Sequence, residues 1–200
     1  MANGALLIAC GALARELVEL KRRNQWPHLR IYCLPAELHN TPDRIPGAVV
    51  ETIEKYRRDY ARIFVAYADC GTGGLLDRAL EDYDIERIPG AHCYEFLAGS
   101  AVFSDMADAE PGTFYLTDFL VRHFDRLLVK TLGLDRHPEL KQQYFGNYKR
   151  LIYLAQTRNE KLSASARAHA DYLGLEFEEH FTGLQPVESL LYEQVVTWQS

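Results

Sequence analysis

The chain has 200 residues, of which 48% are hydrophobic and 25% charged, and its formal net charge is −6. This composition is typical of a globular protein with a substantial core. The negative charge and the lack of a basic stripe argue against nucleic acid as a partner. No apolar run approaches the roughly 20 residues of a membrane span, and four cysteines without a CxxC pair fit a reducing compartment. We therefore expect a cytoplasmic protein with neither a nucleic-acid nor a membrane partner.

The first hundred residues alternate between strand and helix patterns. Residues 5–10, ALLIAC, form an unbroken apolar run typical of a strand buried on both faces, and residues 14–23, ARELVELKRR, read as a helix. This alternation predicts an α/β fold, a mostly parallel Rossmann-like sheet with helices on both faces. The later predicted elements are strands over 29–36 and 62–68, helices over 49–60 and 75–83, and a short fourth strand within 87–99.

The alternation is interrupted around SDMADAEPGT, residues 104–113, which indicates a boundary. We expect a first α/β lobe over residues 1–104, carrying the cysteines, and a second over 105–200, or else a continuation of one sheet. The second half holds predicted strands over 113–117, 150–157 and 175–181 and predicted helices over 119–133, 137–148 and 161–174.

Three cysteines and one histidine follow predicted strands. Cys10 ends the first strand and Cys70 the third, each followed by glycine, Cys93 ends the predicted fourth, and His39 lies in the loop after the second. Ligands bind beyond the carboxyl ends of parallel strands, and neighbouring strands lie about 4.8 Å apart. If the strand order is 2-1-3-4, these four side chains share one site.

This residue set suits a metal. Three thiolates and an imidazole match the tetrahedral sulfur and nitrogen ligands of zinc, whereas three thiolates alone can hold an iron–sulfur cluster (4Fe-4S) with one iron open to substrate. The alternative is that each cysteine is a small core residue, as we expect of Cys33 within its strand. The long spacings make the pattern less specific than a paired CxxC site.

The glycine-rich turn DCGTGG is a second candidate. Its glycines precede a helix and can present backbone N–H groups to a small anion or cofactor, although the stretch is neither GxGxxG nor a P-loop. Glycines also simply close tight turns between strands and helices. The cofactor-binding candidates are Gly11, Gly71, Thr72, Gly73 and Gly74.

Three further residues are weaker candidates. Tyr94 and Glu95 follow Cys93 and are candidates for acid–base catalysis. Asn147 lies in the aromatic turn YFGNY, which suggests either a cofactor pocket or, more commonly, packing of the second lobe.

The stretches ACGAL, LPAELHNTP, DCGTGG, HCYEF, PGTFYLTDFLVRHFD and YFGNYKRLIYLAQ resemble an uncharacterised prokaryotic family, domain of unknown function 1638. The cysteine motifs carry most of this resemblance, and AYADCG stands where YGDCG is expected. The resemblance implies no established reaction. Some members are encoded beside corrinoid-dependent methyl-transfer enzymes, which points to one-carbon metabolism and a partner enzyme.

Three classes of function follow from these observations. The first is a metal-binding protein, with zinc or an iron–sulfur cluster, that acts on a small-molecule or cofactor ligand in one-carbon or corrinoid methyl transfer. The alternative is a metal-free cysteine-dependent enzyme of the racemase or lyase type, although every cysteine lies in the first half. The third is a non-catalytic accessory protein that delivers a metal or cofactor.

Overall fold

The computed structural model describes residues 4–196. They form two compact units, the described parts of Met1–Phe96 with Pro186–Ser200 (unit 1) and Leu97–Gln185 (unit 2). Each unit has its own parallel three-stranded sheet flanked by helices. This confirms the predicted Rossmann-like α/β class with two lobes and excludes one continuous sheet among the described residues.

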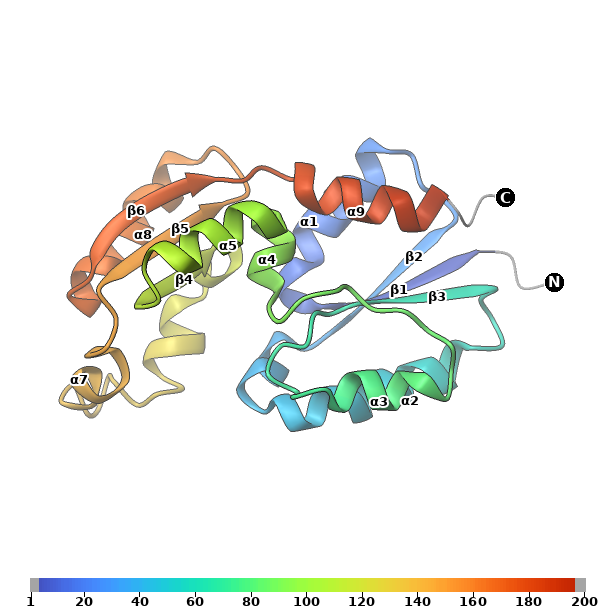
Figure 1. Cartoon of the computed structure of the whole chain (residues 1–200), viewed down its shortest axis with the longest axis horizontal. Helices are drawn as coiled ribbons and strands as arrows, with labels where there is room; N and C mark the ends of the chain where they lie inside the picture. The colour runs from blue at the N-terminus through green and yellow to red at the C-terminus, as the bar shows by residue number, and fades with distance from the viewer. Residues whose placement is uncertain (1–3, 197–200) are drawn as a thin grey trace. The chain divides into compact units, whose positions relative to one another are not determined.

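Unit 1 is built on a sheet of order β2-β1-β3. Every residue of the central strand β1 is buried, as expected for an apolar run covered on both faces. Helices α2 and α3 cover one face of this sheet, and α1 and α9 cover the other (Figure 1). The strands are β1 (Ala5–Cys10), β2 (Leu29–Leu34) and β3 (Arg62–Ala66), and the helices are α1 (Ala14–Arg23), α2 (Ile45–Tyr56), α3 (Leu75–Glu81) and α9 (Gln185–Val196).

The predicted fourth strand within residues 87–99 is wrong. The segment makes one isolated parallel bridge to β3 and then enters α4 (Cys93–Ala98). Pro89 has no backbone N–H to donate, and Gly90 has a φ of +96°, so a regular ladder stops there. Cys93 therefore begins a helix instead of ending a strand.

Unit 2 has the strand order β4-β5-β6. The single helix predicted over residues 119–133 is divided into α6 (Asp118–Arg122) and a π-helical turn, Asp125–Val129. Between them Phe124 is buried, and its ring stacks on His169 with centroids 3.9 Å apart. The other elements are α5 (Ser100–Ala109), β4 (Thr113–Thr117), α7 (Leu140–Phe145), β5 (Arg150–Ala155), α8 (Glu160–Leu173) and β6 (Glu176–Phe181).

The division of the chain differs from the expected boundary near residue 104 in two ways. The whole of α5 (Ser100–Ala109) belongs to unit 2, and the chain returns to unit 1 through α9 (Gln185–Val196). On α9 Leu191 is buried, and the Asn24 side-chain amide donates a 2.7 Å hydrogen bond to Glu188. Such contacts between distant segments leave no trace in a local sequence pattern.

Candidate metal centre

Three potential metal ligands meet at the carboxyl edge of the unit 1 sheet. One ligand atom each from His39, Cys70 and Cys93 lies within 4.8 Å of the other two. His39 lies on the 3₁₀ turn Ala36–Asn40 after β2, Cys70 lies in the loop after β3, and Cys93 is the first residue of α4. Cys70 is buried and the other two are half-buried. We call these three residues the ligand triad.

Cys10 lies beside the ligand triad. It is the last residue of β1, and its Sγ is 3.5 Å from Nδ1 of His39. The same sulfur accepts a 3.3 Å hydrogen bond from the backbone N–H of Ala12. The structure thus brings all four metal-ligand candidates together within unit 1, although Cys10 does not belong to the group whose atoms all lie within 4.8 Å.

The backbone at Cys70 is unusual. Its φ is +50°, in the left-handed region that residues other than glycine rarely adopt. Backbone hydrogen bonds hold it there, since the N–H of Asp69 donates to the carbonyl of Gly90 and the N–H of Cys70 to that of Ala91, at 3.0 and 2.9 Å. Strain of this kind costs about 1–3 kcal/mol and concentrates at functional sites. These bonds tie Cys70 to the segment that leads into Cys93.

The glycine-rich turn is organised around a carboxylate of the chain itself. Asp69 accepts hydrogen bonds from the hydroxyl of Thr72 at 2.7 Å and from the N–H groups of Gly73 and Gly74 at 3.0 and 2.8 Å. The bonds from Gly74 and then Thr72 lower the pKa of Asp69 to about 2. Two N–H groups of the predicted cradle are therefore already engaged, and a cofactor contact at Gly71–Gly74 stays a prediction.

Gly11 allows two chain segments to approach closely. A Cβ added there would lie 2.9 Å from the carbonyl oxygen of Leu34, at the end of β2. Only glycine fits such an approach without displacing backbone. This contact explains the glycine after Cys10, and its predicted cofactor contact stays a prediction.

The remaining predicted site residues have diverse surroundings. Tyr94 and Glu95 follow Cys93 on α4, and both are half-buried. The carboxylate of Glu95 lies against Gly90, where it occupies the space that a side chain would need. Asn147 is exposed and belongs to unit 2, whereas the ligand triad belongs to unit 1. The catalytic roles of Tyr94 and Glu95 and the cofactor role of Asn147 stay predictions.

The protonation pattern of the cluster is asymmetric. The hydrogen bond with Cys93 lowers the pKa of Cys70 to about 5, against burial, and His39 acts in the same direction. The bond with Cys70, followed by burial, raises the pKa of Cys93. Burial alone would lower the pKa of His39, but its contacts with Cys10 and Cys70 raise that pKa to about 10. At neutral pH, Cys70 is therefore a thiolate facing an imidazolium.

Tyr67 is a member of this site that the sequence analysis missed. Its side chain is 1% exposed, and its ring stacks on His39 with centroids 6.2 Å apart and an interplanar angle of 21°. Its hydroxyl has no hydrogen-bond partner among the described residues. The signal was one aromatic residue with a polar tip in the otherwise apolar run FVAYA, three residues before Cys70.

Cys33 corrects one expectation. We expected a buried thiol within a strand, but Cys33 is exposed. The reason is that β2 lies at the edge of the sheet, where one of its neighbours is missing among the described strands. Cys33 provides an internal reference for the thiols of the site.

These features define a two-unit α/β protein with a thiol–imidazole cluster at the edge of one parallel sheet. The family described as "Protein of unknown function (DUF1638)" matches residues 33–191, and the chain belongs to this family, as its motifs predicted. The matched range includes the ligand triad and Tyr67, and Cys10 precedes it. No curated protein and no solved structure matches the chain. Within residues 4–196, none of the helices is long and apolar enough to cross a bilayer.

Proposed function

We propose that unit 1 is a metal-binding module that holds a single ion, zinc in the first place, through His39, Cys70 and Cys93. The observation that carries this proposal is the separation of their ligand atoms, all within 4.8 Å of one another. On a tetrahedral zinc ion, with Zn–S near 2.3 Å and Zn–N near 2.0 Å, two ligand atoms lie roughly 3.3–3.8 Å apart. Small side-chain rotations bring the triad to these separations.

Two features favour a single ion over an iron–sulfur cluster. A four-iron cluster binds each cysteine to a different iron, which sets the sulfurs farther apart than ligands of one ion. The triad also includes an imidazole, and a set of nitrogen and sulfur ligands is typical of zinc. The cluster remains the second metal hypothesis and gives a different experimental result.

The charge of the triad determines what a bound ion can do. Two thiolates and a neutral imidazole balance the charge of a divalent ion, and a metal with three protein ligands can activate a fourth. We propose that this fourth ligand is a thiol or another small molecule in one-carbon or corrinoid methyl transfer, with a partner enzyme in that pathway. A carrier that delivers the metal to such an enzyme would use the same residues and differ in the lack of turnover.

The second candidate function is a metal-free cysteine-dependent enzyme. It is favoured by one observation, the pairing of Cys70 with His39, because the imidazole adds to the hydrogen bond with Cys93 in lowering the pKa of this thiol to about 5. A thiolate next to an imidazolium is the activated form of a nucleophilic cysteine.

The first experiment is metal and sulfide analysis with an absorption spectrum, on protein purified without air. We expect about one zinc per chain and no colour, because the triad supplies ligands for one ion. The variants Cys70→Ser, Cys93→Ser and His39→Ala should lose the metal, whereas Cys33→Ser, at an exposed thiol, should retain it.

The other outcomes separate the hypotheses. Brown protein containing iron and sulfide would show that the site holds an iron–sulfur cluster and not zinc. Protein that binds neither, even after reconstitution, would reject the metal centre and leave the cysteine-dependent enzyme as the function to test.

A further inference from the structure

The hydroxyl of Tyr67 is a buried polar group that has no hydrogen-bond partner among the described residues. The side chain is 1% exposed, and no described residue forms a hydrogen bond with the hydroxyl. An unpaired buried hydroxyl costs about 1–3 kcal/mol. Phenylalanine would fill the same volume without that cost, so the hydroxyl calls for a reason other than packing.

Its position supplies that reason. The ring of Tyr67 stacks on the imidazole of His39 with an interplanar angle of 21°, and Tyr67 belongs to the same buried cluster as Cys10 and Cys70. Tyr67 therefore lies beside the ligand triad. A group bound there receives a hydrogen-bond donor that the protein has already placed.

The number of ligands leaves one coordination position to fill. The triad of His39, Cys70 and Cys93 supplies three ligand atoms, and a tetrahedral ion takes four. Cys10 lies outside that close group. Zinc sites with three protein ligands keep the fourth position for water or substrate.

We propose that the fourth ligand of the ion is a small external anion that accepts a hydrogen bond from the hydroxyl of Tyr67, an inference that rests on the proposed metal centre. The chemical class is a monoanion that coordinates through one atom, such as a thiolate, a hydrosulfide or a carboxylate. Cys10 then lies next to this ligand instead of binding the ion.

Charge and space both limit the ligand to this class. A divalent ion with two thiolates and a neutral imidazole has no net charge, so one further negative charge is easier to hold in a buried site than two. Cys70 and Tyr67 are 8% and 1% exposed, which favours a small group over a bulky one. An anion also gains most from a hydroxyl donor, because hydrogen bonds to charged groups are the stronger ones.

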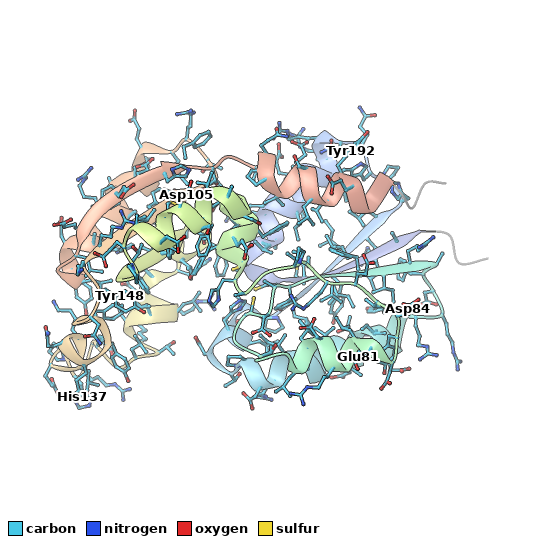
Figure 2. The ribbon with its side chains drawn as sticks, in the orientation of Figure 1. Glu81, Asp84, Asp105, His137, Tyr148 and Tyr192 are labelled. Carbon is cyan, nitrogen blue, oxygen red and sulfur yellow. The ribbon has the colours of Figure 1, made fainter. Side chains whose placement is uncertain are left out.

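The test uses the full chain loaded with Co²⁺, whose visible absorption reports the number and type of ligands, and sodium azide as a small anionic probe. We expect saturable spectral changes on azide addition. Tyr67→Phe should raise the Kd for azide about five- to tenfold, since one hydrogen bond is lost, and leave the affinity for Co²⁺ unchanged. Tyr192→Phe, a change at an exposed tyrosine on α9 (Figure 2), serves as the matched control.

Each other result has a distinct meaning. An unchanged Kd for azide in Tyr67→Phe would overturn the role of the hydroxyl. A spectrum that azide does not alter, and that loses intensity in Cys10→Ser, would make Cys10 the fourth ligand and overturn this inference while the metal centre stands. A protein without any cobalt bands would reject the metal centre itself, and the inference with it.

Discussion

The two units differ in how polar side chains are paired at the carboxyl edges of their sheets. In unit 2 the first residue after β4 is Asp118, whose side chain is fully buried. Its carboxylate accepts hydrogen bonds from the hydroxyl of Tyr153 at 2.6 Å, from the N–H of Gln156 at 3.0 Å and from the hydroxyl of Thr157. Arg122 approaches it at 3.4 Å. This network ties the end of β4 to the end of β5 and is internally satisfied.

The corresponding edge of unit 1 is not satisfied in this way. Cys70 adopts a left-handed backbone, two cysteines and a histidine crowd together, and the hydroxyl of Tyr67 has no partner among the described residues. A polar network that satisfies all its members stabilises a fold, whereas an unsatisfied one is stabilised by whatever binds it. The comparison indicates a structural role for the edge in unit 2 and supports the binding role proposed for the edge in unit 1.

The largest effect should come from removing the carboxylate in unit 2. Asp118→Ala leaves a buried hydroxyl and a buried N–H without their acceptor, and we expect it to lower the free energy of unfolding by about 3–5 kcal/mol. Chemical denaturation measures this change. Asp105→Ala, at an exposed position on α5 (Figure 2), is the control and should change the stability by less than about 0.5 kcal/mol. Equal stabilities of the two variants would show that the network is not structural.

The second prediction concerns the thiolate of unit 1 in protein freed of metal. Because the pKa of Cys70 is about 5, its thiolate is lost only as the pH falls through that value. Its alkylation rate constant should therefore be nearly flat from about pH 6 to about pH 8. The exposed Cys33 is the reference, because desolvation of its sulfur and then Cys10 raise its pKa above the ordinary value. Its alkylation rate constant should therefore gain about tenfold per pH unit over this range. Mass spectrometry of the alkylated peptides gives both rates.

The same assay can isolate the contribution of the His39 imidazole to the lowered pKa of Cys70. In His39→Ala the hydrogen bond and the positive charge that help to lower the pKa of Cys70 are gone, so its rate should fall near neutral pH and rise again in alkaline solution. Identical pH profiles for Cys70 in the original chain and the variant would contradict the thiolate–imidazolium pair.

Regular elements could be predicted from the sequence because their burial is local. The apolar run at residues 5–10 and the amphipathic helix at 14–23 appear in the structure as β1 (Ala5–Cys10) and α1 (Ala14–Arg23). The exposure of Cys33 was not predicted, although the order 2-1-3-4 considered for the sheet already places the second strand at an edge, where the structure has it. The return of α9 to unit 1 depends on packing between segments far apart in sequence.

The site residues likewise divide into those that the sequence predicts and those that only the structure places. Placing ligands at strand ends was sufficient to select Cys10, which ends β1, and His39 and Cys70, which follow β2 and β3. Cys93 lies at the same site for a different reason, since the segment before it is tied to the β3 loop by backbone hydrogen bonds. Tyr67 was missed because an unpaired hydroxyl is a property of its surroundings and not of its residue type.

A smaller effect is expected from the turn that carries Cys70. Asp69→Ala removes the acceptor for three hydrogen bonds, from Thr72 and the two glycine N–H groups, and so releases the turn that follows Cys70. We expect the zinc affinity to fall about tenfold, as when a supporting residue of a metal site is removed. Competition with a chelating dye measures the affinity, and Asp43→Ala, at an exposed position, is the control. An unchanged affinity in a folded Asp69→Ala variant would mean that the turn does not position Cys70.

The smallest effect sharpens the comparison most, because it uses the same substitution in each unit. Tyr67→Phe removes a hydroxyl that has no partner among the described residues, so we expect the free energy of unfolding of the metal-free chain to rise by about 1 kcal/mol, the lower end of the cost of an unpaired buried hydroxyl. Tyr153→Phe removes a 2.6 Å bond to a buried carboxylate and should lower it by about 1.5–3 kcal/mol. Both side chains are almost fully buried, so packing contributes alike and the difference reports hydrogen bonding. A loss at Tyr67 as large as that at Tyr153 would show that its hydroxyl is already paired, and the proposed anionic fourth ligand would lose its hydrogen-bond donor.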